Sequence, residues 1–252
     1  MKKNDKEGAF SLRLIIFGII LLISALILLY PKIDIEDKKS ENTEAEISQS
    51  SLEKNLGETQ ITASEDKPLE IPSKKVLSMS FASQAPSGDW SEPWQNACEE
   101  ASIDIVRYYL NEKTLSKESM RDDILSMVDW QMKNWGGHYD LTAEKTLILA
   151  QNVYGLSGEV LSDYSVDSIK RLIASGVPVI VPTDGRLLGN PNFTNGGPEY
   201  HMLVIKGYDS AGFITNDPGT RKGEGYYYLY QTVLESVKNP DGGQKELLIV
   251  TK

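Results

Sequence analysis

The chain has 252 residues, with 36 Asp and Glu against 26 Lys and Arg, which gives a formal net charge of −10. This acidic balance, without a basic stripe, excludes nucleic-acid binding as a function, because phosphate contacts require clustered cations. One cysteine and two distant histidines cannot supply a tetrahedral ligand set. We therefore expect neither a metal nor another cofactor.

The first predicted element is a transmembrane helix over residues 10–30, which follows a short tail at residues 1–9. From Leu14 to Tyr30 the sequence is uncharged and almost wholly apolar, and with its flank it reaches the roughly 20 residues that span a bilayer. The stretch ends without the small-residue pattern of a signal-peptide cleavage site, which favours an anchor. A slight excess of basic residues before the span predicts a cytoplasmic N-terminus. We expect a single-pass protein of the cell membrane with its globular domain outside.

Two further segments complete the chain. Residues 31–75 are rich in Glu, Lys, Ser, Asn and Thr and poor in aromatic residues, which predicts a disordered polar linker. Residues 76–252 contain enough apolar sequence for one domain with its own core.

The first part of this domain is predicted to be helical. Ala101, Ile105 and Tyr109 recur at helical spacing after Cys98, and this helix should end at Asn111. Cap signals and apolar periodicity predict three more helices, at Lys117 to Trp130, at Thr142 to Val153 with Thr142 as N-cap, and at Ser165 to Ala174 with Gly176 as C-cap.

The second part is predicted to be a sheet. From Val177 onward, short apolar or alternating runs are separated by Gly, Pro, Asn and Asp: VPVIVPT, HMLVIKGYD, GFITND, YYYLY and KELLIVTK. Helices followed by strands predict an α+β domain, in which the helical part packs on one side of an antiparallel sheet.

Cys98 stands where a polar loop leads into the first helix of the domain. A thiol at a helix N-terminus faces unpaired N–H groups and the positive end of the macrodipole, and both favour the nucleophilic thiolate. A single buried cysteine is more often an inert small hydrophobe. Glu99 and Glu100 would raise the thiol pKa if they faced it. We expect their side chains to point away from the sulfur and to interact with the dipole instead.

His201 and Asp217 begin and end two runs that should form a β-hairpin. If the loop has an odd number of residues, such as Tyr208 to Ser210, the two side chains are cross-strand neighbours on one face and can pair. An even-numbered turn at Ser210-Ala211 would place them on opposite faces. Alone, His201 would be a structural histidine, and Asp217 before Pro-Gly would only shape a turn.

A helix-start Cys, a strand His and a carboxylate on the next strand resemble the papain-like arrangement. The motifs FASQAPSGDW, QNACEEAS, HMLVIKGYD and TNDPGT are similar, in this order, to those of the peptidase C39-like family. This resemblance implies a papain-like fold and a cysteine peptidase that cleaves a peptide or protein substrate through a thioester.

The resemblance also implies the roles of individual residues. Cys98 would be the nucleophile, His201 the base and then the acid, Asp217 the carboxylate that orients the ring, and Gln84 the oxyanion-hole side chain. The chain departs from the leader-peptidase pattern, because Glu rather than Gly follows Cys98 and an insert separates Gln84 from it. Gln95 therefore remains a competing candidate for the oxyanion hole. No P-loop is present, so cleavage of double-glycine leaders is not implied.

Two other functions are open on the sequence alone. One is a non-catalytic domain of the same fold that binds peptide or cell-envelope polymer. The other is a cysteine acyltransferase, in which an amine resolves the thioester. A long polar loop, residues 189–198, lies just before His201 and is expected beside the site, while His138 is expected to be structural or to line the substrate site. Trp90, Trp94, Trp130 and Trp135 are expected either in the core or as an aromatic wall.

Overall fold

The computed structural model describes residues 71–252, which belong to one compact unit. The predicted transmembrane helix and nearly all of the predicted linker lie outside the described residues. Within residues 71–252 no helix is both long and apolar enough to cross a membrane.

The four predicted helices are present. Three begin at a Ser or Thr N-cap whose side chain accepts a backbone N–H, namely Ser116, Thr142 and Ser165. The third predicted helix is followed by Gly155 at a positive φ of 67°. The second continues to Trp135, five residues beyond the predicted Trp130, and ends at Gly136 with φ 77°. The bounds are α2 Cys98–Leu110, α3 Lys117–Trp135, α4 Ala143–Tyr154 and α5 Val166–Ala174.

The sheet is antiparallel throughout, as predicted, with the strand order β2-β7-β3-β4-β5-β6 and a short β1 paired to β4. The strands are β1 Lys75–Val76, β2 Ser157–Leu161, β3 Val179–Thr183, β4 His201–Tyr208, β5 Gly212–Asn216, β6 Tyr226–Leu229 and β7 Leu247–Thr251. The two central strands, β3 and β4, are buried along their whole length. Both of their faces are therefore covered.

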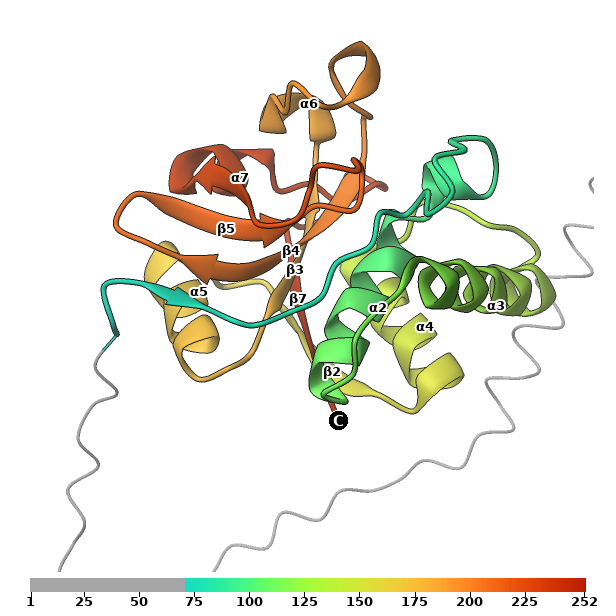
Figure 1. The fold of residues 1–252 in the computed structure, drawn as a ribbon, viewed down its shortest axis with the longest axis horizontal. Coiled ribbons are helices and arrows are strands. Elements are labelled where there is room, and N and C mark those ends of the chain that lie inside the picture. Colours follow the sequence, from blue (N-terminus) through green and yellow to red (C-terminus); the bar gives the residue numbers. More distant parts are fainter. Residues whose placement is uncertain (1–70) are drawn as a thin grey trace, which may run out of the picture. The chain divides into compact units, whose positions relative to one another are not determined.

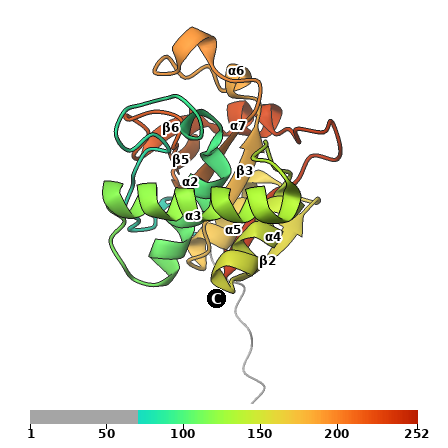
Figure 2. The same ribbon diagram turned by 90° about the vertical axis from the view of Figure 1, so that its right-hand side faces the viewer.

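Helices cover the sheet on two sides rather than one. In Figure 1, α2, α3 and α4 lie on one side of the central strands, and α5 lies on the other. Figure 2 shows α3 running across the front of this helical layer. The prediction that the helical part packs on one side is correct for α2 to α4 and wrong for α5. Its strongly amphipathic sequence buries Ile169 and Ile173, because β4 offers a second apolar face.

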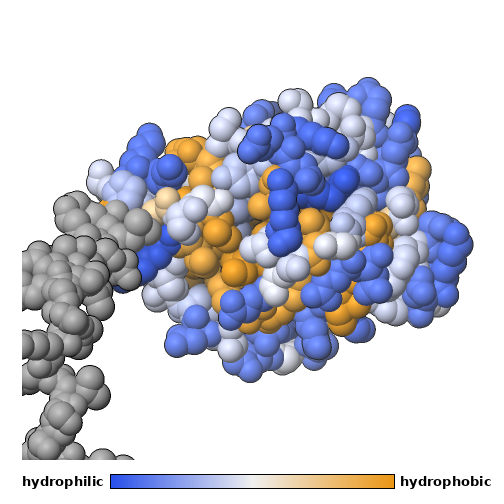
Figure 3. Space-filling model, turned by 90° about the horizontal axis from the view of Figure 1, so that it is seen from below, coloured by the Kyte–Doolittle hydropathy of each residue, from blue (hydrophilic) through white to orange (hydrophobic). Residues whose placement is uncertain are grey.

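The sequence analysis missed several short elements. These are β1, β2, the helices α6 Gly185–Leu188 and α7 Tyr230–Ser236, and the 3-10 turns η1 Trp94–Asn96 and η2 Thr194–Gly196. The predicted strand YYYLY divides at Leu229 into β6 and the start of α7. On the face in Figure 3, apolar residues are visible in several places between polar side chains.

An ion pair joins the first two helices of the domain. The guanidinium of Arg107 on α2 donates to Asp104 Oδ1 at 2.8 Å and also to Asp123 on α3. It lies over the ring of Tyr154 on α4, 3.9 Å from the centroid. Asp104 is fully buried, and burial raises the pKa of its carboxyl well above its ordinary value, so only the charge of Arg107 favours the ionised form.

Replacing Arg107 by methionine is expected to lower the free energy of unfolding by about 3 kcal/mol, because it leaves the buried Asp104 without a counter-charge. Urea unfolding followed by circular dichroism measures this change. The control is Arg121→Met, which removes an exposed pair with Asp122 and should cost less than about 1 kcal/mol. Equal losses in the two variants would contradict the assignment.

Candidate active site

Cys98 is the first residue of α2 and is nearly buried, with 4% exposure. The N–H groups in the first turn of a helix have no helical acceptor, so the backbone around Cys98 offers hydrogen-bond donors. The preceding turn η1 leads the chain into this helix, and Ala97 is completely buried beneath it. The sulfur therefore lies at the start of α2, and this helix packs against β4.

The expectation that Glu99 and Glu100 point away from the sulfur is wrong for Glu99. Both side chains are fully buried, and Glu99 Oε2 lies 3.1 Å from Cys98 Sγ. Burial, and then the neighbouring Glu99, raise the pKa of the Cys98 thiol well above its ordinary value. Burial and the charge of Glu100 likewise raise the pKa of Glu99. The resting site thus favours a neutral thiol beside a neutral carboxylic acid.

His201 and Asp217 form the expected pair, but through a different register. Tyr208 pairs with Phe213 and the Asp209 N–H donates to Gly212 O, so the turn is the even-numbered Ser210-Ala211 and the odd-numbered loop is wrong. A β-bulge at Lys206 then shifts the register by one residue. Because side chains alternate between faces, this shift returns His201 and Asp217 to the same face. His201 Nε2 lies 2.8 Å from Asp217 Oδ1.

Asp217 is completely buried and bound by several donors. Its Oδ1 also accepts the Gly219 N–H at 3.0 Å, while Oδ2 accepts the Tyr228 hydroxyl at 2.6 Å and the Asn190 amide at 3.3 Å. Burial by itself would raise the pKa of this carboxyl, but His201 and these hydrogen bonds outweigh it and hold the pKa below its ordinary value. Asp217 is therefore an anion that can fix the Nε2–H tautomer of His201, leaving Nδ1 as the basic nitrogen.

Two neighbours fix the His201 ring in place. The Phe193 ring meets it edge to face, with centroids 5.3 Å apart. A Cβ added to Gly219 would stand 2.7 Å from His201 Cε1, so only glycine fits at this position. Sequence reasoning identified neither of these residues, nor Tyr228 and Asn190 as partners of Asp217. Gly219 lies inside the TNDPGT motif, and this motif is the sequence signal that could have identified it.

Gln84 and Gln95 both lie at the site, in different environments. Gln84 is buried, and its amide Nε2 donates to the carbonyl oxygens of Trp94 at 2.9 Å and Gln95 at 3.1 Å. Its Oε1 is buried without a hydrogen-bond partner. The Gln95 side chain is exposed and donates to Glu92 Oε1 at 2.5 Å. The choice between them as oxyanion-hole residue stays a prediction.

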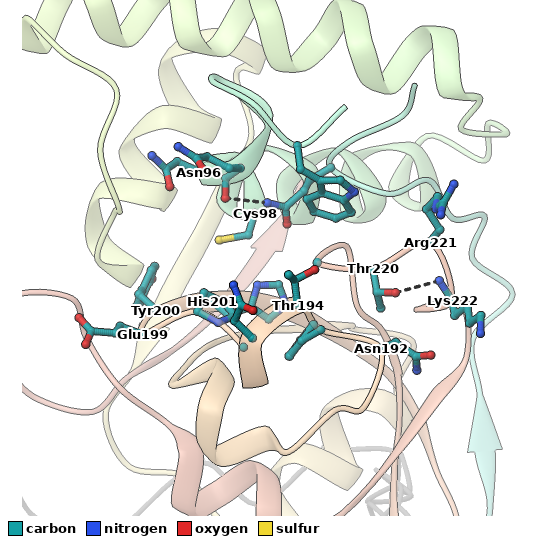
Figure 4. A pocket seen from close by; sticks show the side chains of 18 of the residues that line it. Asn96, Cys98, Asn192, Thr194, Glu199, Tyr200, His201, Thr220, Arg221 and Lys222 are labelled. Atoms are coloured by element: carbon teal, nitrogen blue, oxygen red, sulfur yellow. Dashed lines mark hydrogen bonds between the residues drawn. The ribbon is translucent and has the colours of Figure 1, made fainter. Parts of the chain in front are cut away.

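These residues meet in one open cavity of about 870 Å³. Figure 4 shows Cys98 and His201 on facing sides of it, with Glu199 and Tyr200 toward one end and Arg221 and Lys222 toward the other. The loop at residues 189–198 supplies much of the lining, as expected from its position before His201.

The other residues considered in the sequence have mainly structural surroundings. His138 Nε2 lies 3.3 Å from Glu100 Oε1, close enough for an ion pair, and it does not line the cavity. Trp130 and Trp135 pack edge to face on α3, with centroids 5.0 Å apart. Trp90 lines the cavity, whereas Trp94 packs partly buried against the core.

Comparisons with known proteins agree with the quoted motifs. A profile of the Peptidase_C39 like family matches residues 76–240, which confirms the resemblance. Among solved structures, the chain resembles a C39-like peptidase candidate from Bacillus anthracis, with 17% identity and a TM-score of 0.49 over 72% of this chain and 98% of that one. It also resembles xylellain, a cysteine protease from Xylella fastidiosa, with 14% identity and a TM-score of 0.37 over 73% and 87%. No curated protein matches.

Replacing Tyr228 by phenylalanine is expected to raise the pKa of Asp217, because the anion loses its shortest hydrogen bond. A lowered carboxyl pKa stabilises the fold above the unfolded-state pKa of about 3.9, and this stabilisation is lost as the pH falls through the folded-state pKa. The variant should therefore lose about 2 kcal/mol of unfolding free energy at neutral pH. The loss should shrink in acid.

Urea unfolding of both proteins at neutral and acid pH measures this difference. Tyr226→Phe is the control, because its ring lies beside Tyr228 in the same strand but its hydroxyl is not bonded to Asp217. A loss in Tyr228→Phe that does not change with pH would mean that its hydroxyl does not act through the charge of Asp217.

Proposed function

The chain belongs to the Peptidase_C39 like family, and we propose that it is a cysteine peptidase that cleaves peptide bonds with Cys98, His201 and Asp217. The observation that carries this proposal is the buried His201–Asp217 pair, 2.8 Å between Nε2 and Oδ1, whose His201 lines the same cavity as the only cysteine of the chain. A structural histidine needs neither a buried anion on one nitrogen nor a thiol across an open cavity.

In the proposed reaction, the Cys98 thiol gives its proton to His201 Nδ1 as Sγ attacks the substrate carbonyl carbon. The C–N bond then breaks, and the leaving amine takes the proton from His201. This leaves a thioester on Cys98. Water, deprotonated by His201, attacks the thioester carbonyl carbon. The C–S bond then breaks, the carboxylic acid is released, and the Cys98 sulfur takes the proton back from His201. Asp217 remains ionised and stabilises the imidazolium that forms twice during the cycle.

The carbonyl oxygen becomes an anion in both attacks and requires donors. The Cys98 backbone N–H at the start of α2 is one candidate, and the Gln84 amide is the second. Because both Gln84 contacts are to carbonyl oxygens, one amide hydrogen must leave its acceptor when substrate binds. The longer contact, at 3.1 Å to Gln95 O, is the one expected to break.

The cavity suits an extended chain better than a small molecule. It is open, with Arg221 and Lys222 at one end and, at the other, Glu199 in an ion pair with Arg186. The loop at residues 189–198 is proposed to contact the substrate. We also propose that residues 10–30 anchor the protein in the cell membrane with this domain outside, on the basis of the apolar sequence from Leu14 to Tyr30.

Alkylation of Cys98 by iodoacetamide across pH tests the proposal. His201→Ala is expected to slow alkylation at neutral pH by at least about tenfold and to move the reaction to higher pH, because the thiol loses its proton acceptor. Asp217→Asn should cause a smaller loss. Mass spectrometry measures the labelled fraction.

A peptide mixture incubated with the wild type and with Cys98→Ala then reports cleavage directly. Products that appear only with the wild type support hydrolysis, whereas products joined to an added amine indicate an acyltransferase. If Cys98 reacts identically with and without His201, the peptidase proposal is wrong and a binding module of the same fold becomes the better explanation.

A further inference from the structure

The buried carboxyl group of Glu99 has no role in the triad, yet it is a polar contact of the Cys98 sulfur. Glu99 Oε2 lies 3.1 Å from Cys98 Sγ, and neither residue is more than 4% exposed. The proposed reaction turns this sulfur into an anion. A buried group at this distance must then either stabilise the thiolate or oppose it.

The second oxygen of Glu99 determines which of these occurs. Oε1 accepts the backbone N–H of Leu141 at 2.6 Å, from the loop between α3 and α4. Oε2 accepts only the Cys98 thiol at 3.1 Å, and S–H is a weaker donor than a backbone N–H, so the proton of a neutral Glu99 belongs on Oε2. That oxygen faces the sulfur. When Cys98 loses its own proton, the Oε2–H group is therefore oriented to donate to Sγ.

Burial and two acidic neighbours, Glu100 on α2 and Asp140 in the loop between α3 and α4, favour this neutral form. The hydrogen bonds from Leu141 and Cys98 lower the pKa of Glu99, but burial outweighs them. The Tyr200 hydroxyl donates to Leu141 O at 2.5 Å, which joins the segment before β4 to the α3–α4 loop beside Glu99.

No lysine or arginine in residues 71–252 forms an ion pair with Glu99. The nearby imidazole of His138 is directed at Glu100, not at Glu99. Burial and the charge of Glu100 raise the pKa of Glu99, in agreement with this geometry.

We propose that Glu99, as the free acid, donates a hydrogen bond from Oε2 to the Cys98 thiolate, and that ionisation of Glu99 switches the nucleophile off. This inference rests on the proposed peptidase function. The thiol proton goes to His201 Nδ1, the O–H of Glu99 turns to the sulfur, and the proton of Glu99 is not transferred. An ionised Glu99 would instead place a carboxylate 3.1 Å from the thiolate.

The sign of the pH dependence follows from the neutral form. Below the raised pKa, Glu99 is neutral and supports the thiolate, and above it the carboxylate opposes the thiolate. Activity should therefore decline as the pH rises through the pKa of Glu99, whereas ionisation of a thiol without this neighbour would only increase it.

Two variants distinguish the hydrogen bond that residue 99 donates to the sulfur from the effect of its charge. Glu99→Gln keeps an acceptor for Leu141 N–H and a permanent N–H donor for the sulfur, so it should remain reactive and lose the alkaline decline. Glu99→Leu keeps neither, and its alkylation and peptide-cleavage rates should fall roughly 10- to 100-fold at all pH values. Glu100→Gln removes the adjacent buried carboxylate, which does not touch the sulfur but whose charge raises the pKa of Glu99, so the alkaline decline should persist and move to lower pH.

The experiment measures iodoacetamide alkylation and peptide cleavage across pH for the full-length wild type, these three variants and His201→Ala, with thermal unfolding as a check on folding. If Glu99→Gln retains the alkaline decline, the inference is wrong, even where Glu99→Leu fails to fold. Equal rates in a folded Glu99→Leu and in Glu99→Gln would also overturn it. Reactivity that is insensitive to His201→Ala contradicts the peptidase function itself, so the two failures are distinguishable.

Discussion

The buried carboxylate of Asp217 binds three other segments of the chain as well as the backbone of its own turn. It binds His201 at the start of β4, Tyr228 on β6, Asn190 in the loop before β4, and the Gly219 backbone beyond its own strand. A buried anion is tolerated only when donors surround it, so these contacts fix both the fold of this region and the orientation of the imidazole. Stability and the proposed chemistry therefore depend on one group.

The same turn also positions the proposed oxyanion hole. Pro218 O accepts the Gln84 backbone N–H at 3.0 Å and the Ser83 hydroxyl at 3.2 Å. The segment that leads to Gln84 runs along β4, where the Lys206 ammonium group donates to the Met79 carbonyl oxygen. The segment before α2 is thus attached to the sheet that carries His201 and Asp217. On the other side of the cavity, Cys98 belongs to the helical layer, where acidic rather than basic neighbours surround it.

The sequence predicted regular elements well where local signals were strong. N-cap residues and apolar periodicity located α2, α4 and α5 almost to the residue, because capping and amphipathicity act over a few positions. The strand β2 was missed because Ser157–Leu161 has no fully buried residue, and it forms only by pairing with β7 at the other end of the domain. The position of α5 on the second face of the sheet was also missed, because it too depends on contacts between segments that are distant in the sequence.

The sequence by itself determined the family, and four short motifs in order made Cys98, His201 and Asp217 the candidate site residues. Only the tertiary structure decided how they meet. The bulge at Lys206 sets the face on which His201 and Asp217 lie, and hairpin parity cannot be read from residue types. The direction of Glu99 was likewise decided by packing, because a helix places its side chain at Cys98 or away from it according to what the α3–α4 loop offers, here the N–H of Leu141.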